Sequence, residues 1–340
     1  MAGIVSETSQ SATTMTRVAT ELAPIALFVY RRPAHTARLL TSLAGNRLSG
    51  SSILYIFSDA PACDAHCADV AEVRALVRDL RGFGRVIVVE RDNNIGCAAN
   101  VIDGVSQVLR DYDRVIVIED DLELSPHFLG FMNQALDTYR DRKDVFSVSA
   151  ASPPPQALGM AEEGRPDVYL APRSVPWGWA TWADRWKGVD WQLAGFAGKR
   201  WKPTWRRRMA RGGNDLLSML DDQMTGRIDS WNVRFNHAQA MAGSYSLYPC
   251  YAYVRNAGLD GSGLHCRATD RYEINLRQAI EAPCMLSDIQ PDRDLMRAVK
   301  SYHDEHPLSL WLGSVPGVRA AIRSVKKHLG VDRPLLKRKP

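Results

Sequence analysis

Three consecutive acidic residues, Glu119, Asp120 and Asp121, interrupt the segment RVIVIEDDLELSPHF at residues 114–128. They directly follow a run of β-branched residues that is typical of a buried strand. Neighbouring carboxylates repel one another and resist burial, so such a cluster needs a positive partner. Mg²⁺ or Mn²⁺ would serve, because these ions prefer oxygen ligands and are often held by one or two carboxylates together with substrate phosphates.

The absence of a glycine-rich phosphate loop strengthens the metal interpretation. The sequence contains neither G-x-x-x-x-G-K-[ST] nor G-x-G-x-x-G, whose backbone N–H groups hold phosphates in other proteins. A cation would then have to offset the phosphate charge. We expect Asp121 to contact the cation directly, with Asp120 beside it and Glu119, nearest the strand, supporting them. The alternative is a solvated acidic turn.

The elements that would position these acids alternate regularly over residues 1–150. Apolar, strand-like runs occur at Pro24–Tyr30, Ser52–Ser58, Arg85–Glu90, Arg114–Ile118 and Val145–Ala150. Helical periodicities lie between them, beginning at Pro33, near Val70, near Ala98 and at Ser125-Pro126. Near-continuous apolar runs fit parallel strands that are buried on both faces. The pattern predicts an α/β fold with a central, mostly parallel sheet and right-handed crossovers.

Polar residues follow four of these predicted strands. They are Tyr30–Arg32, Ser58-Asp59, Arg91–Asn94 and Glu119–Asp121. In open α/β sheets, ligands bind beyond the carboxyl ends of the strands. We therefore expect the four groups to meet at one edge of the sheet.

Composition narrows the function and the cell compartment. The 340 residues are 45% hydrophobic, which allows a sizeable core, and the net charge of +5 is too mild for a dedicated nucleic-acid binder. Cys63, His66 and Cys67 lie close together, but no second ligand pair is near, which favours free thiols over a zinc site. We expect a cytoplasmic protein whose first residues, 1–22, form a disordered leader.

The segment VIVIEDDLELSPHFLGFMNQAL, residues 115–136, resembles the metal-binding segment of GT-A glycosyltransferases. The likeness is greatest to the N-acetylglucosaminyltransferase I type and to bacterial family-2-like sugar transferases. Further similar segments follow in the family's order: PIALFVYRRP, FSDAP, NNIGCAANVIDGV, PWGWATWADRWKGVDW, SWNVRFNHAQAMAGSYSLYP and NAGLDGSGLHC. The resemblance implies a GT-A fold with a Rossmann-like nucleotide-binding half, and divides the chain at 23–150 (nucleotide-sugar half), 151–272 (acceptor half) and 273–340 (basic helical extension).

The family resemblance also implies donor-binding residues at the strand ends. Asp59 would meet the base, Asp120 would face the ribose or sugar as well as the metal, and Tyr30 would lie near the nucleotide. The other candidates for the nucleotide-sugar are Arg31, Asn94, Gly96, Asn100, Trp177 and Trp179. The two tryptophans could stack on a pyranose, because aromatic faces match the apolar faces of sugars; Trp182 and Trp186 are expected in the core.

One acid before a tryptophan is the candidate catalytic base. The N-acetylglucosaminyltransferase I type carries two adjacent acids there, and the second is its base. This sequence has only Asp229, in Ile228-Asp229-Ser230-Trp231, so Asp221 and Asp222 remain alternatives. Desolvation beside Trp231 would raise the pKa of the carboxyl and suit it to accept a proton. Asp229 could equally be a helix N-cap.

Three further features bear on ligands and partners. His265 follows a glycine-containing loop and could supply a metal ligand or reach a diphosphate, although a structural histidine is the alternative. Tryptophans alternate with basic residues at Lys199–Arg211, and Val318–Gly330 has the pattern of a basic amphipathic helix. Such patterns favour peripheral contact with the inner face of a membrane, or else a solvated basic surface.

The resulting expectation is a metal-dependent glycosyltransferase of the hexosyltransferase type. It would move a sugar, with inversion, from a nucleotide-sugar, UDP-linked in the family's usual case, to a hydroxyl of a glycan, polysaccharide or lipid-linked acceptor. A divalent cation, Mn²⁺ or Mg²⁺, is the expected cofactor. Two alternatives stay open: a sugar-1-phosphate nucleotidyltransferase, and a non-catalytic carbohydrate-binding or scaffold protein of the same fold.

Overall fold

Strands and helices alternate through the first half of the chain, as the sequence predicts. The computed structural model describes residues 21–199, 201–260, 275–276 and 279–304. The strands in these residues are β1 (Ile25–Val29), β2 (Ile53–Ser58), β3 (Arg85–Glu90), β4 (Arg114–Glu119), β5 (Leu122–Leu124), β6 (Val145–Ser149), β7 (Val168–Ala171), β8 (Trp179–Trp182), β9 (Tyr245–Pro249) and β10 (Val254–Asn256). The α-helices are α1 (Pro33–Ala44), α2 (Cys67–Arg78), α3 (Cys97–Asp111), α4 (Phe128–Thr138), α5 (Ala183–Lys187), α6 (Phe196–Lys199), α7 (Pro203–Met209), α8 (Asp215–Met224), α9 (Trp231–Ala242) and α10 (Arg293–His303).

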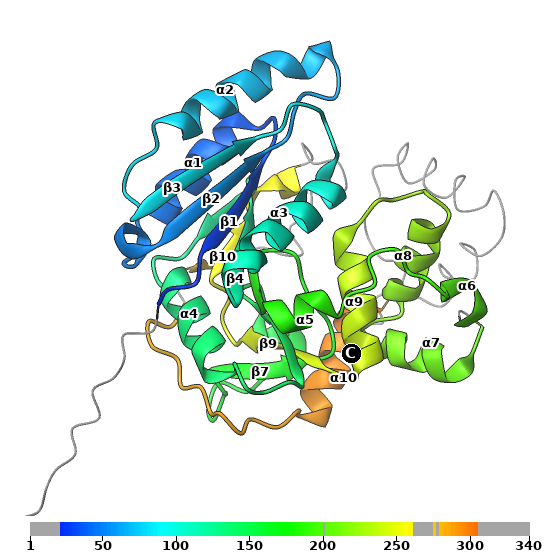
Figure 1. Ribbon diagram of the computed structural model, residues 1–340. Coiled ribbons are helices and arrows are strands. Elements are labelled where there is room, and N and C mark those ends of the chain that lie inside the picture. Colours follow the sequence, from blue (N-terminus) through cyan, green and yellow to red (C-terminus); the bar gives the residue numbers. More distant parts are fainter. Residues whose placement is uncertain (1–20, 200, 261–274, 277–278, 305–340) are drawn as a thin grey trace, which may run out of the picture.

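The central sheet has eight strands in the order β3-β2-β1-β4-β8-β6-β9-β7 (Figure 1). Neighbouring strands from β3 to β4 all run parallel. In this register Val29 pairs with Ser58, Ser58 with Glu90, and Phe28 with Glu119. The carboxyl ends of the four strands therefore lie at one edge, and the predicted α/β fold with a mostly parallel sheet and a Rossmann-like first half is confirmed.

The second half of the sheet differs from a simple continuation of that pattern. β6, which the sequence predicts as the fifth strand, is separated from β4 by β8, and β8 runs antiparallel to both. β9 then pairs parallel with β6, and β7 pairs antiparallel with β9. A short antiparallel pair, β5 with β10, lies outside the main sheet and joins the residues after the acidic cluster to a segment far along the chain.

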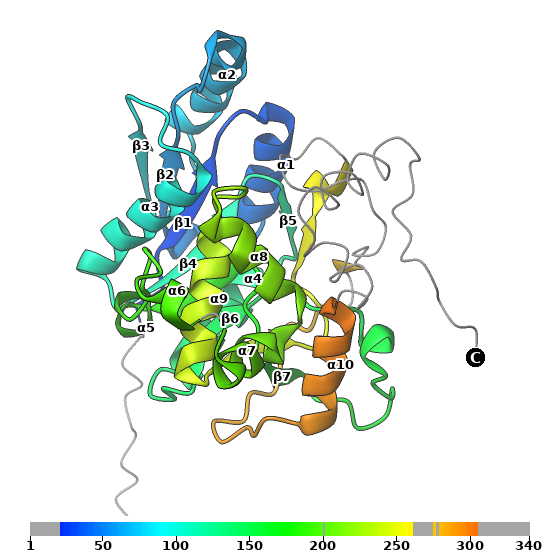
Figure 2. The same ribbon diagram turned by 90° about the vertical axis from the view of Figure 1, so that its right-hand side faces the viewer.

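Both faces of the parallel strands are covered by helices. Ile25, Leu27 and Val29 point to a core that they share with α1, α2 and α4, whereas Ala26 and Phe28 point to a core shared with α3 and α9. Figure 2 shows α1 and α3 on opposite sides of strands β1–β3. This double coverage explains the uninterrupted apolar character of the strands in the sequence.

Some predicted boundaries shift in the structure. Helix α4 begins at Phe128 rather than at Ser125-Pro126, because residues 126–127 form a turn closed by the bond from the Phe128 N–H to the Ser125 carbonyl, 3.0 Å. The stretch 279–292, expected to be helical, has no α-helix before α10. Among the described residues, no helix is long and apolar enough to cross a membrane. The leader at 1–20 and the basic pattern at 318–330 lie outside the described residues.

Candidate active site

The acidic cluster lies where β4 leaves the sheet. Glu119 is the last residue of β4, and Asp120 and Asp121 form the turn into β5. The backbone N–H of Tyr30, just after β1, donates to Oδ2 of Asp120 over 3.2 Å. Arg32, two residues further on, donates from Nη1 to Oδ2 of Asp121 over 3.1 Å. The positive charge beside the cluster is therefore a guanidinium from the neighbouring strand end.

One guanidinium does not offset three carboxylates in this setting. Burial, and then the charges of Asp121 and Asp120, raise the pKa of Glu119 to about 8, although Trp231 and Arg32 act in the opposite direction. Burial and the charge of Asp121 likewise raise the pKa of Asp120 to about 7, against the lowering effect of Arg32. Both acids would ionise more easily if further positive charge entered the site.

Asp121 has one carboxylate oxygen that the protein does not use. Its Oδ2 accepts from Arg32, but Oδ1 is buried and has no hydrogen-bond partner within the described parts of the chain. Buried polar atoms are nearly always paired, so this carboxylate oxygen is a candidate ligand atom. No cluster of three His, Cys, Asp or Glu side chains among the described residues is arranged to hold a metal. The oxygen donors of this turn nevertheless fit a hard cation that keeps waters and substrate oxygens as its other ligands.

A glycine from a distant segment closes one side of the Asp121 carboxylate. Gly258 follows β10, and a Cβ added to it would stand 2.5 Å from Oδ2 of Asp121 and 2.9 Å from Nη1 of Arg32. The segment is held there by the Ala257 N–H, which donates to the Asp121 carbonyl over 2.7 Å. Only glycine leaves room for the pair of Asp121 and Arg32 at this point.

The carboxylate of Asp59, which is predicted to meet the base, accepts hydrogen bonds from the protein itself. Its Oδ1 accepts from the N–H groups of Ala60 (2.9 Å) and Ile95 (3.1 Å), and its Oδ2 accepts from the Gly96 N–H (2.9 Å) and Asn94 Nδ2 (3.2 Å). The carboxylate thus ties the end of β2 to the loop before α3. Asp59, Asn94 and Gly96 are brought together as predicted neighbours, while any contact with a base stays a prediction.

The other candidates at the strand ends also lie in this region. The Tyr30 hydroxyl accepts from the Ala62 N–H over 3.0 Å and lies 2.8 Å from Nδ1 of His66, so His66 faces the tyrosine. Nη1 of Arg31 lies 3.9 Å from Oδ2 of the exposed Asp69. Asn100 is buried in the first turn of α3, where its Oδ1 accepts from Nε of Arg91 over 3.1 Å.

Cys97, at the start of α3, relates the predicted base to the acidic cluster. Burial raises the pKa of its thiol, and the charges of Glu119, Asp120, Asp121 and Asp229 raise it further. Part of the side chain nevertheless remains open to solvent. The Cys97 thiol is thus a group on which both Asp229 and the strand-end acids act.

Asp229 itself is not desolvated in this structure. Its side chain is 61% exposed and accepts from Nη2 of Arg234 over 2.6 Å. The N-cap reading of Asp229 is wrong, because Ser230 is the N-cap of α9 and its Oγ accepts from the Val233 N–H over 3.4 Å. The alternative acid Asp222 is buried and accepts from Nε of Arg227 over 2.6 Å.

The tryptophans have different environments. Trp179 is only 1% exposed, so its ring offers no face to a sugar; it stacks on Trp231 with ring centroids 4.7 Å apart. Trp231 in turn makes a side-chain hydrogen bond to Glu119. The structure thus corrects the expectation of a sugar contact at Trp179 and places that ring in the core, against Trp231. Trp182 and Trp186 are core residues, as predicted.

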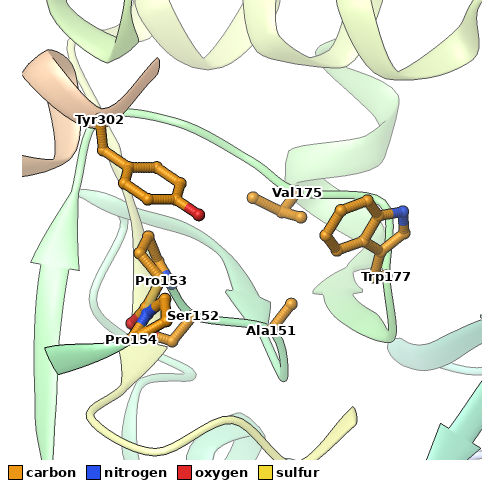
Figure 3. A pocket seen from close by; sticks show the side chains of 7 residues that line it. All are labelled: Ala151, Ser152, Pro153, Pro154, Val175, Trp177 and Tyr302. Carbon is orange, nitrogen blue, oxygen red and sulfur yellow. The ribbon is translucent and has the colours of Figure 1, made fainter. Parts of the chain in front are cut away.

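Trp177 lies beside a small apolar pocket. Its ring lines the pocket together with Val175 and Tyr302, and Figure 3 shows Tyr302 reaching from α10 toward Pro153. The void is about 20 Å³, room for about one water and not for a pyranose. Trp177 stays a prediction as a sugar-stacking residue.

The sequence does not predict a role for two residues of the site, and one predicted ligand lies outside the described residues. The sequence shows Arg32 as one of two arginines that follow the first strand, where it could meet the nucleotide or be solvated, and it does not predict a contact with Asp121. Gly258 lies in the segment NAGLDGSGLHC, but nothing local indicates that it meets Asp121. His265, the third predicted metal ligand, is outside the described part of the chain.

Comparison with known proteins gives little. No family model matches the sequence, and no curated protein matches it. Among the solved structures that match is a mannosyltransferase from Pyrobaculum calidifontis in complex with GDP-Man and Mn²⁺, which is 13% identical; the match covers 66% of this chain and 70% of that chain, with a TM-score of 0.36. Because that score is low, no conclusion about the site rests on the match.

Proposed function

We propose that this protein is a metal-dependent glycosyltransferase of the hexosyltransferase type that uses a nucleotide-sugar donor. The observation that carries the proposal is Oδ1 of Asp121, which is buried without a partner among the described residues. It lies beside two acids of raised pKa at the carboxyl edge of the parallel strands. A site with surplus buried negative charge gains most from a divalent cation, Mn²⁺ or Mg²⁺, accompanied by phosphates. The sequence resemblance to GT-A enzymes supports the same function.

The proposed reaction is the attack of an acceptor hydroxyl on the anomeric carbon, with departure of the nucleoside diphosphate. When bound, the cation would offset the charge that develops on the leaving diphosphate. Asp121 and Asp120 are its proposed protein ligands. His265 remains a third proposed ligand from outside the described residues.

Asp229 is the proposed general base. Its carboxylate is accessible, as a residue that must meet an acceptor would be, and its charge acts on the Cys97 thiol together with the charges of the three strand-end acids. Arg234, which donates to Asp229 over 2.6 Å, would hold the carboxylate in position until the acceptor arrives. Attack from the side opposite the leaving group would invert the anomeric centre.

The donor half of the proposed site comprises the strand ends of β1–β4 and the loop before α3. Tyr30, Arg31, Asn94, Gly96 and Asn100 are the proposed neighbours of the nucleotide. Asp59 organises the loop that carries Asn94 and Gly96. We propose that residues 23–150 form the donor half and 151–272 the acceptor half, with UDP as the carrier of the sugar.

The proposed acceptor is a glycan, polysaccharide or lipid-linked saccharide, with the protein peripheral to the inner face of a membrane. Support for a membrane contact comes from α7 and the residues before it. Five basic side chains there are exposed, and none forms an ion pair with an acid among the described residues: Lys199, Lys202, Arg206, Arg207 and Arg208. Trp201, between them, is 72% exposed. Basic residues and an exposed tryptophan together suit an anionic lipid surface.

A donor screen tests the proposed function. Melting temperature and donor hydrolysis would be measured with UDP- and GDP-linked sugars, each with and without Mn²⁺. We expect one donor to raise the melting temperature only when Mn²⁺ is present. Asp121→Asn should abolish that Mn²⁺-dependent shift, whereas the matched control Asp294→Asn, at a carboxylate that is 87% exposed, should retain it.

A further arm of the screen, with UTP and a sugar 1-phosphate as substrates, distinguishes the alternatives. A nucleotidyltransferase would release pyrophosphate from UTP and a sugar 1-phosphate, which a glycosyltransferase does not. A scaffold protein would show neither reaction, and Asp121→Asn would leave its ligand binding unchanged. Either result would refute the proposed function.

A further inference from the structure

We propose that Arg32 is the counter-ion of Asp121 when no donor is bound, and that it competes with the divalent cation for this carboxylate. When the donor binds, its diphosphate attracts the guanidinium away from Asp121. Cation and donor would then bind cooperatively through one arginine. The inference rests on the proposed function, because it takes Asp121 as the metal ligand. It concerns the order and coupling of binding, which the proposed function leaves open.

The contact between Arg32 and Asp121 is largely buried. The two side chains are 20% and 18% exposed, and the Nη1–Oδ2 distance is 3.1 Å. Gly258 lies against the same two groups, and any side chain at this position would collide with them. Oδ1 of Asp121 has no partner among the described residues. Arg32 therefore occupies one oxygen of the carboxylate while the other is left for a ligand.

A cation and a guanidinium cannot share this carboxylate at low cost. Two positive groups a few ångströms apart in a partly buried site repel strongly. Arginine cannot relieve the repulsion by losing a proton, because its pKa is too high. The Arg32 side chain must then move away from Asp121 or weaken the binding of the cation.

The local backbone indicates that the side chain moves and the main chain stays. The Arg32 carbonyl accepts from both the N–H and the Oγ1 of Thr36, each over 2.9 Å, at the start of α1. The residue is thus anchored between β1 and α1. A guanidinium released there has a strong new partner in a diphosphate, whose oxygens it can contact with two parallel hydrogen bonds. Arg32 would so become a positioning residue for the donor.

Manganese titration without nucleotide tests the competition. The free Mn²⁺ concentration would be followed by electron paramagnetic resonance with wild type, Arg32→Gln, Arg32→Lys and a control, Arg255→Gln. Arg255 lies on β10 and forms an ion pair with Glu123 on the neighbouring strand β5, outside the acidic cluster. We expect Arg32→Gln to tighten Mn²⁺ binding on the order of tenfold. Arg32→Lys, which keeps the charge, and Arg255→Gln should stay within about threefold of wild type.

A second titration in the presence of UDP tests the coupling, after correction for Mn²⁺–UDP complexes in solution. We expect UDP to tighten Mn²⁺ binding in wild type, and Arg32→Gln to lose most of this enhancement. A merely structural Arg32 would lower both affinities together. Circular dichroism melting would show that the variants are folded.

Failure of this inference can be told apart from failure of the proposed function. If Arg32→Gln binds Mn²⁺ no more tightly than wild type while Asp121→Asn binds none, the competition is refuted and the metal site stands. If Arg32→Lys behaves like Arg32→Gln, charge is not the cause and the inference is also refuted. If Asp121→Asn binds Mn²⁺ as wild type does, the proposed function itself fails.

Discussion

The backbone N–H of Gly96 donates a 2.9 Å hydrogen bond to Oδ2 of Asp59, across a gap of 37 residues in the chain. Gly96 has a φ of 81°, a conformation that favours glycine, and it is the N-cap of α3. Because Asp59 also accepts from Ile95 and Asn94, one buried carboxylate sets the shape of the turn that leads into α3. The loop is therefore ordered before any ligand arrives.

Replacing Asp59 should damage the fold and the donor site together. Asp59→Ala removes the acceptor of three backbone N–H groups, one of them buried, which should lower the free energy of unfolding by about 2–4 kcal/mol. Asp59→Asn keeps one acceptor oxygen and should cost less. Urea unfolding and the affinity for the donor found in the screen would be measured, with the exposed Asp294→Asn as control. Unchanged stability in Asp59→Ala would contradict a structural role for the carboxylate.

Gly258→Ala should weaken Mn²⁺ binding without unfolding the protein. The added methyl group would collide with Oδ2 of Asp121 at 2.5 Å, so the carboxylate must shift. We expect about a tenfold loss in Mn²⁺ affinity, since a displacement of a ligand oxygen by an ångström is felt directly by the metal.

Gly130→Ala is the matched control for that substitution. Gly130 lies within α4, and a Cβ there meets nothing within 4 Å. The control should be stabilised by about 0.5–1 kcal/mol, as is usual for glycine to alanine in a helix, with unchanged Mn²⁺ affinity. Equal Mn²⁺ affinities in the two variants would show that Gly258 is not needed at the carboxylate.

Glu119 should make the metal-free protein less stable as the pH rises. Its pKa is raised from 4.5 to about 8 on folding, so the folded protein holds this proton more tightly than the unfolded chain does. The stability contributed by the neutral form is complete below pH 4.5 and is lost as the pH rises to about 8. Glu119→Gln mimics the neutral acid at every pH.

The difference in melting temperature between Glu119→Gln and wild type, in the presence of a chelator, measures this effect. It should grow in favour of the variant across that pH window and level off above it. Glu72→Gln, on the exposed surface of α2, is the matched control. A difference that stays constant with pH would mean that Glu119 is ionised throughout.

The basic surface around α7 should bind anionic vesicles. Co-sedimentation would compare neutral vesicles with vesicles containing about one third phosphatidylglycerol; we expect binding only to the latter, weakening with salt. Arg206→Glu should reduce binding on the order of tenfold, because it removes one positive charge and adds a negative one. Trp201→Ala should reduce binding less steeply and with little dependence on salt.

Arg293→Glu, at the start of α10, is the charge-matched control for the vesicle experiment. It changes the net charge by the same amount on a different surface. Equal losses in Arg206→Glu and Arg293→Glu would show that only overall charge matters. Equal binding to a short DNA duplex and to vesicles would instead indicate a general polyanion surface.

Local pattern predicted the parallel half of the fold well. β1 to β4 and the helices between them follow the apolar runs and helical periodicities, because the apolar residues of each segment are the ones that it buries. The insertion of β8 between β4 and β6 was not predicted. Its residues Trp179–Trp182 form an aromatic run that suits a core strand, but the pattern does not say which strands it pairs with.

The sequence by itself determined that three acids end a buried strand and that four polar strand ends share one edge, since strand direction and burial follow from residue type and order. Only the tertiary structure decided what surrounds those acids. Arg32 reaches Asp121 from 89 residues away in the chain, and Gly258, which follows β10, lies against the same carboxylate. Trp179 stacks on Trp231 in the core. Such contacts depend on the packing of distant segments in three dimensions, and a one-dimensional pattern carries no record of them.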